Sequence, residues 1–272
     1  MEQKKLKLSS LELNYYESTG TGSPIMLIHG NSASGLSYQR QINSPLGEKH
    51  RIVAIDLPGH GDSQAFAEMS EYGMPGYAGV ITAAAEALGM QDAVFVGWSL
   101  SGHIVLEAHN QLPQAKGIVI FGTPPLAFPP AMEEAYLPNP AMGIGFSPEV
   151  TKEQAQTYAD AFFVPETTAP KDPFVTDILR TDGNARAGLA ASIKPDGYQD
   201  EVEVVGKMSQ PLAILHGEEE QLVNKAYISK LKIPTLWRNK IQTITASGHA
   251  PHWEQAEEFN RLLEAFIADV TQ

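Results

Sequence analysis

FVGWSLSGH, residues Phe95 to His103, joins a short apolar run to residues that are compatible with a helix. Gly97 comes two residues before Ser99, and the helix-compatible residues begin directly after this serine. A serine at the carboxyl end of a buried strand, with a glycine before it and a helix after it, is the pattern of a nucleophile elbow. The turn is strained, so small residues on both sides allow the strand and the helix to approach closely. The stretch therefore predicts a strand, a sharp turn and a helix.

The stretch departs from the usual G-x-S-x-G pattern, because Ser101 stands at the second glycine and Gly102 follows it. If Ser101 were the nucleophile, His103 would occupy a position that needs a small residue. Ser99 is therefore the predicted nucleophile. Serine is also a favoured helix N-cap, so a purely structural role for Ser99 stays open on this motif alone.

The rest of the chain alternates between strand-like and helix-like segments. Short aliphatic runs with the composition of buried parallel strands lie at 25–30, 51–61, 93–99, 117–125, 211–217 and 241–249. Helix-compatible segments include 74–88 and 254–268. This order predicts an α/β fold with a mostly parallel, doubly wound sheet.

The alternation stops between about 124 and 205. This part is rich in proline at its start, has no convincing strand, and contains predicted helices at 148–163 and 173–179. We interpret 125–205 as a helical cap inserted between two parts of the core, 1–124 and 206–272.

Composition limits the function classes. The net charge of -13 opposes binding to nucleic acid or anionic lipid, and a chain without cysteine has no disulfides, thiolate metal sites or cysteine nucleophile. The opening residues lack the apolar region of a signal peptide, and no segment has the roughly 18 consecutive apolar residues of a membrane span. We expect a cytoplasmic protein whose partner is a small molecule; the sequence predicts no oligomeric state.

Candidate partners for Ser99 follow later strands. The acidic cluster Glu218 to Glu220 comes after the strand at 211–217, and His249 follows the last predicted strand. A serine hydroxyl needs a histidine to take its proton and a carboxylate to orient that histidine, and in such folds the chain order is serine, acid, histidine. A solvated acidic loop and an ordinary loop histidine are the alternatives. The matching order favours catalysis.

Four motifs together resemble the landmarks of the α/β-hydrolase family over essentially the whole chain: HGNSAS at 29–34, DLPGHGDS at 56–63, GWSLSG at 97–102 and SGHAPHWEQAEEF at 247–259. This resemblance implies that Ser99 is the nucleophile, His249 the general base and acid, and Glu220 the acid of the triad. It also implies an oxyanion hole formed by the backbone N–H groups of Asn31 and Leu100.

The acid of the triad has two candidates in this sequence. The family more often has aspartate at this position, and the longer glutamate side chain leaves Glu219 as an alternative to Glu220. Glu220 stands three residues after Gly217, and Val223 three further on, which is the register of the family. This register favours Glu220.

Two further motifs narrow the resemblance. Haloalkane dehalogenases and epoxide hydrolases need aspartate where this chain has Ser99. GTPP at 122–125 and RTDGNAR at 180–186 are similar to the serine-dependent N-acyl-homoserine lactone hydrolases; a turn and a charged cap loop are the structural alternatives. The resemblance implies opening of a lactone ring through an acyl-enzyme. A general carboxylesterase and a non-catalytic ligand receptor remain alternatives.

No metal or other cofactor is predicted. Metal-dependent lactonases need a dense cluster of histidine and aspartate, whereas the eight histidines of this chain are scattered. His249 and His252 in HAPH offer at most one pair of ligands.

The cap is expected to select the substrate. Phe128, Met142 and Phe146 are predicted to line an apolar channel for an acyl chain, and Tyr158 is predicted to hold an amide or lactone oxygen. Ordinary packing is the alternative for each of these side chains.

Overall fold

A single eight-stranded sheet forms the centre of the molecule. The structure is a computed structural model that describes residues 1–271. The strands have the order β1-β2-β4-β3-β5-β6-β7-β8, and all neighbours from β4 through β3 to β8 are parallel. Their bounds are β1 Glu2–Lys7, β2 Glu12–Glu17, β3 Pro24–Ile28, β4 Arg51–Ile55, β5 Val94–Trp98, β6 Gly117–Phe121, β7 Leu212–Gly217 and β8 Gln242–Ile244. The predicted mostly parallel α/β sheet is confirmed.

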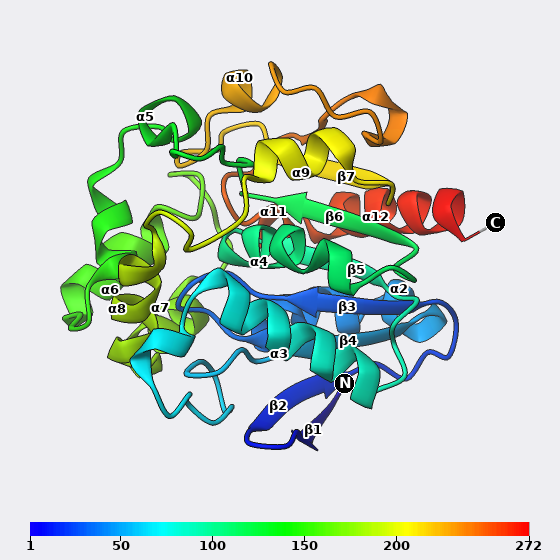
Figure 1. The fold of residues 1–272 in the computed structure, drawn as a ribbon, viewed down its shortest axis with the longest axis horizontal. Helices are drawn as coiled ribbons and strands as arrows, with labels where there is room; N and C mark the ends of the chain where they lie inside the picture. The colour runs from blue at the N-terminus through cyan, green and yellow to red at the C-terminus, as the bar shows by residue number, and fades with distance from the viewer. Residues whose placement is uncertain (272) are drawn as a thin grey trace.

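Helices cover both faces of this sheet. Figure 1 shows α3, α4 and α9 in front of it and α12 behind it. The helices of the core are α1 Gln39–Ile42, α2 Pro45–Lys49, α3 Met74–Ala87, α4 Leu100–Ala108, α10 Lys225–Ile228, α11 Pro251–Glu254 and α12 Ala256–Val270, with 3-10 turns η1 Gly35–Tyr38, η2 Met69–Glu71, η3 His109–Gln111 and η5 Trp237–Asn239. Because both faces are covered, β5, β6 and β7 are buried along their whole length, which explains their continuous apolar sequence.

The first two strands form an antiparallel hairpin at the edge of the sheet, which the sequence analysis did not predict. In β1 only alternate residues are even partly buried, and the strand contains three lysines. An edge strand needs few apolar residues, and lysines on it discourage pairing with other chains.

The segment between β6 and β7 contains only helices and turns. It holds α5 Met132–Ala135, η4 Pro140–Phe146, α6 Lys152–Asp160, α7 Asp172–Arg180, α8 Gly183–Ser192 and α9 Glu201–Lys207. In Figure 1, α6, α7 and α8 group at the left, at the end of the sheet to which the arrows of β3 and β6 point. Helix α9 crosses the proposed cap boundary at residue 205 and packs on α4 of the core. The division into core and cap is kept as a proposal.

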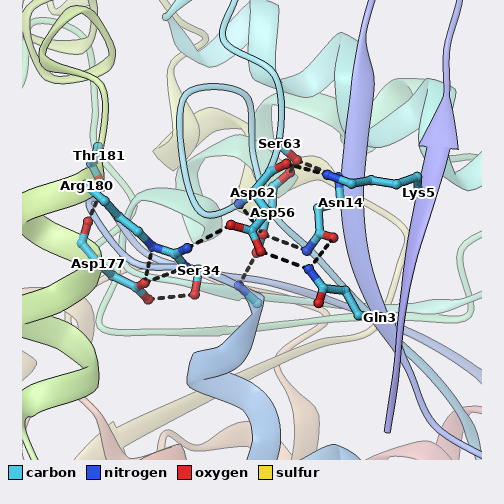
Figure 2. Close-up of polar contacts among 11 residues, drawn as sticks. Gln3, Lys5, Asn14, Ser34, Asp56, Asp62, Ser63, Asp177, Arg180 and Thr181 are labelled. Carbon is cyan, nitrogen blue, oxygen red and sulfur yellow. Dashed lines mark hydrogen bonds and ion pairs between the residues drawn. The ribbon is translucent and has the colours of Figure 1, made fainter.

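The segment RTDGNAR is ordered, and it joins the cap to the core. Arg180 at the end of α7 pairs with Asp177 at 2.7 Å and with Asp62 at 2.9 Å, and Asp177 accepts a hydrogen bond of 2.6 Å from Ser34 in the loop after β3 (Figure 2). Asp182 caps the unpredicted helix α8 by accepting from the N–H of residue 184. The charged residues of this segment are thus used in helix capping and in contacts between the proposed cap and the core.

No helix within residues 1–271 combines the length and apolar character needed to span a bilayer.

Candidate active site

Ser99 lies in the sharp turn between β5 and α4. Its backbone has φ 53° and ψ -117°, a conformation that residues other than glycine rarely adopt. A methyl group at Gly97 would lie 2.3 Å from the carbonyl oxygen of Ser101, and one at Gly102 would lie 2.1 Å from Oγ1 of Thr123. The small residues that this crossing requires are therefore Gly97 and Gly102.

Ser101 has a different role from the glycine it replaces in the usual pattern. Its side chain is fully buried, and its hydroxyl donates a hydrogen bond to the carbonyl oxygen of His29 at the end of β3. The start of α4 is thereby linked to the loop that carries Asn31.

His249 and Glu220 form a buried pair. Nδ1 of His249 lies 2.9 Å from Oε2 and 3.1 Å from Oε1 of Glu220, and the backbone N–H of Leu222 donates to Oε1 at 2.8 Å. A carboxylate can only accept, so Nδ1 carries the hydrogen and Nε2 of the neutral ring is left as the acceptor. Glu218 and Glu219 are exposed, so the structure brings Glu220, and not its neighbours, to His249.

The ionised form of Glu220 is stabilised at this position. Burial by itself would raise its pKa, but the charge and the hydrogen bond of His249, together with the N–H of Leu222, more than offset burial, and the pKa is lowered. The carboxylate is therefore charged at neutral pH and can stabilise an imidazolium at His249.

The loop after β3 is held on both sides. Nδ1–H of His29 donates to the carbonyl of Gly30 at 2.8 Å, while Nε2 accepts from the N–H of Leu57 at 2.9 Å. Nδ2 of Asn31 donates to the carbonyl of Gly145 in the cap at 2.6 Å. Among residues 1–271, the backbone N–H groups of Asn31 and Leu100 donate to no other group of the protein. Both are thus free to donate to a ligand oxygen.

These groups face one cavity beneath the cap. It is lined by Asn31, Ser99, Leu100 and His249 together with mostly apolar side chains: Met74, Leu126, Met132, Met142, Phe146, Leu189, Ile193 and Leu222. Met142 and Phe146, which the sequence analysis proposed for an acyl-chain channel, are among these lining residues. A mostly apolar cavity whose lining includes a serine and a histidine suits an ester with an apolar substituent.

Tyr158 lies over the same cavity, on α6. A methyl group at Gly145 would lie 2.5 Å from the Tyr158 hydroxyl and 3.0 Å from Nδ2 of Asn31, so only glycine allows this close approach of cap and loop. Burial raises the pKa of Tyr158, and its phenol is therefore a hydrogen-bond donor at all ordinary pH values.

Phe128 requires a correction, because it does not line the cavity. Its side chain is 36% exposed and packs edge-on against Tyr198, with 5.6 Å between the ring centroids. The sequence of this proline-rich segment does not show which of its apolar side chains face the cavity, because the apolar residues do not repeat with the period of a helix or a strand.

Four polar residues of the cavity were not predicted as site residues: His103, Tyr136, Tyr198 and Glu201. His103 contacts Glu201 at 2.8 Å and the hydroxyl of Tyr136 at 3.1 Å, and all three line the cavity. The sequence contains one signal for this group that the prediction did not use: His103 follows Ser99 by four residues, which is about one helical turn. The partners of His103 are far away in sequence and could not be found in this way.

No group of three or more His, Asp or Glu side chains within residues 1–271 is arranged to hold a metal ion.

Comparison with known sequences identifies the family of this chain. The profile of the alpha/beta hydrolase family matches residues 25–262. A pimeloyl-[acyl-carrier protein] methyl ester esterase of Xylella fastidiosa is 27% identical over 268 residues, covering 93% of this chain and 98% of the esterase. A non-heme chloroperoxidase of Burkholderia pyrrocinia is also 27% identical, covering 90% of this chain and 91% of its own.

Comparison with solved structures gives a higher similarity. A mutant of the N-acyl homoserine lactonase AidH, complexed with N-hexanoyl homoserine lactone, superposes with a TM-score of 0.94 at 33% identity, covering 100% of this chain and 99% of that chain. A second AidH mutant, complexed with N-hexanoyl homoserine, matches with the same TM-score and identity and covers 98% of that chain.

Proposed function

Since this chain belongs to the alpha/beta hydrolase family and is a serine hydrolase acting on ester bonds, we propose that its substrates are N-acyl-homoserine lactones, whose ring it opens through an acyl-enzyme. The proposed catalytic residues are Ser99, His249 and Glu220, and the proposed oxyanion hole is formed by the backbone N–H groups of Asn31 and Leu100.

The first half of the reaction forms the acyl-enzyme. Oγ of Ser99 attacks the ring carbonyl carbon while Nε2 of His249 takes the hydroxyl proton. The carbonyl oxygen becomes an oxyanion that accepts from the N–H groups of Asn31 and Leu100, and such donors typically contribute several kcal/mol. The bond between the carbonyl carbon and the ring oxygen then breaks, and His249 returns its proton to that oxygen.

The second half releases the product. A water molecule gives a proton to His249 and attacks the ester carbon of the acyl-enzyme. The bond to Ser99 breaks, and Ser99 recovers its proton from His249. The product is the open N-acyl-homoserine, and throughout both halves Glu220 orients the ring of His249 and stabilises its charged form.

The choice of a lactone as substrate is supported mainly by one observation, the match over the full length to a lactonase complexed with an acylated lactone. The apolar cavity at Ser99 agrees with an acyl chain, and the Tyr158 hydroxyl can donate to an amide or lactone oxygen. A carboxylesterase with the same residues is the second candidate, favoured by the relatives that are esterases.

The test compares acylated lactones, acyl-free lactones and aryl esters on the purified protein, with product formation measured for each. We expect the acylated lactones to react much faster, because binding of the acyl chain can be used at the transition state. Faster cleavage of simple aryl esters would favour the carboxylesterase. Tight binding of lactone without turnover would favour a receptor.

A further inference from the structure

The cavity contains a second group of linked polar side chains, separate from Ser99, His249 and Glu220. Glu201, His103 and Tyr136 form a chain of carboxylate, imidazole and hydroxyl, with Nδ1 of His103 at 2.8 and 2.9 Å from the two carboxylate oxygens and Nε2 at 3.1 Å from the Tyr136 hydroxyl. His103 and Glu201 are 5% and 2% exposed. An ionisable pair buried in this way adds little stability compared with apolar side chains of similar volume. Since the pair adds little stability, we look for its role in what it contacts, which is the hydroxyl of Tyr136.

Both partners of the hydroxyl are themselves fixed. Oε2 of Glu201 also accepts from the backbone N–H of Leu126 at 2.7 Å, so the carboxylate is occupied on one side and cannot rotate freely. His103 is held by its position on α4, and Tyr136 follows α5. Elements from the core and from the cap therefore converge on one phenol oxygen at the cavity wall.

Tyr136 is suited to binding and not to covalent chemistry. Burial and the charge of Glu201 raise its pKa, so the phenol keeps its proton. With neutral His103 the phenol donates to Nε2, and its oxygen is free to accept from a ligand; with charged His103 it accepts from Nε2–H and is free to donate. A ligand hydroxyl can both donate and accept, so it fits either state.

The spacing of Ser99 and His103 along the chain suggests which part of a substrate would meet this group. His103, Tyr136 and Glu201 line the same cavity as Ser99, and a helix rises about 6 Å over the four residues from Ser99 to His103. In an N-acyl-homoserine lactone, five bonds separate the ring carbonyl carbon from the third carbon of the acyl chain, an extended length of about 6 Å. The amide lies closer to the ring than this carbon does.

We propose that the Tyr136 hydroxyl, positioned by His103 and Glu201, binds a hydroxyl substituent on the third carbon of the acyl chain. This inference rests on the proposed lactonase function and adds a substrate preference to it. Tyr136 is the binding residue; His103 and Glu201 are positioning residues that act through it.

The test uses six-carbon N-acyl-homoserine lactones with and without a hydroxyl on the third acyl carbon, each enantiomer being measured separately. We expect the wild-type protein to have a kcat/KM about fivefold higher for the better hydroxylated substrate, the size of one net hydrogen bond. Tyr136→Phe should reduce this ratio to about 1, since phenylalanine retains the apolar contacts of the ring and removes only the hydroxyl.

The matched control is Tyr227→Phe. Tyr227 lies outside the cavity lining, and its hydroxyl donates to the carbonyl of Pro125 at 2.9 Å. This variant also loses a phenol hydroxyl, but it should keep the wild-type ratio of kcat/KM between the hydroxylated and the unsubstituted lactone. The inference is overturned if the wild-type protein has no preference, or if Tyr136→Phe keeps the preference. If the wild-type protein opens neither lactone, the proposed function itself fails, and the inference fails with it.

Discussion

Replacing Glu220 with glutamine tests the proposed acid most directly, because the two residues differ only in one group. Oε1 of Glu220 accepts from the fixed backbone N–H of Leu222 at 2.8 Å, while Oε2 lies 2.9 Å from Nδ1 of His249. In Glu220→Gln the single amide oxygen stays on Leu222, so the amide NH2 faces Nδ1. The ring must then accept at Nδ1 and carry its hydrogen on Nε2.

This is the wrong tautomer for catalysis, since Nε2 can no longer take the proton of Ser99. The corresponding loss in a serine protease of different fold is about 10⁴ in kcat, and we expect a similar loss here. At 1.36 kcal/mol for each factor of ten, this amounts to about 5.5 kcal/mol of transition-state stabilisation.

The assay is kcat on one lactone and one ester at a fixed pH, with Glu219→Gln as the matched control. Glu219 is exposed, so its variant should retain the wild-type rate within about twofold. The reasoning is refuted if Glu220→Gln retains more than about a tenth of the wild-type kcat. A comparable loss in Glu219→Gln would move the acid back by one residue.

Three further outcomes are expected. Ser99→Ala should lose turnover by about a millionfold and still bind substrate; retention of a few per cent of the rate would exclude Ser99 as the nucleophile. Ser101→Ala leaves the buried carbonyl of His29 without its donor, so urea unfolding should show a loss of about 1–3 kcal/mol with activity largely kept, and an inactive but folded variant would contradict this. Burial lowers the pKa of His60 to about 4, so near pH 5 the unfolded chain binds this proton and the folded chain does not, and stability falls as pH falls from 6.5 to 4. His60→Gln should therefore reduce the slope of unfolding free energy against pH by about 1.2 kcal/mol per pH unit near pH 5, and an unchanged slope would show that His60 titrates normally.

The sequence was most informative where local composition and topology agree. The parallel strands were found because burial on both faces leaves a continuous apolar run, as in β6. The acidic cluster Glu218 to Glu220 could be placed near His249 because both follow strands that end at the same edge of the sheet, whereas the choice of Glu220 within it came from the register of the family that the chain resembles.

The sequence was least informative where contacts are distant or one-sided. The edge hairpin β1–β2 carries charges on its exposed positions and lacks an apolar run. Phe128 and Phe146 are the same residue type in the same proline-rich region, yet of these two only Phe146 lines the cavity. His103 was not predicted as a site residue, because Glu201, its partner, is 98 residues away in the chain. Contacts between residues so far apart in the chain can be identified only in the folded structure.

The polar seam between cap and core also limits how this protein can be engineered. Asn31 donates to Gly145, Ser34 donates to Asp177, and Arg180 pairs with Asp62, so residues on both sides of the seam complete one another. A chimera whose new cap lacks partners for Asn31, Ser34 and Asp62 would leave the buried donors of Asn31 and Ser34 unpaired, and would leave Asp62 at the surface without its arginine. It would also release the loop that carries the Asn31 N–H. The cap is therefore not an exchangeable module, and a graft intended to change acyl-chain preference has to transfer both halves of the seam.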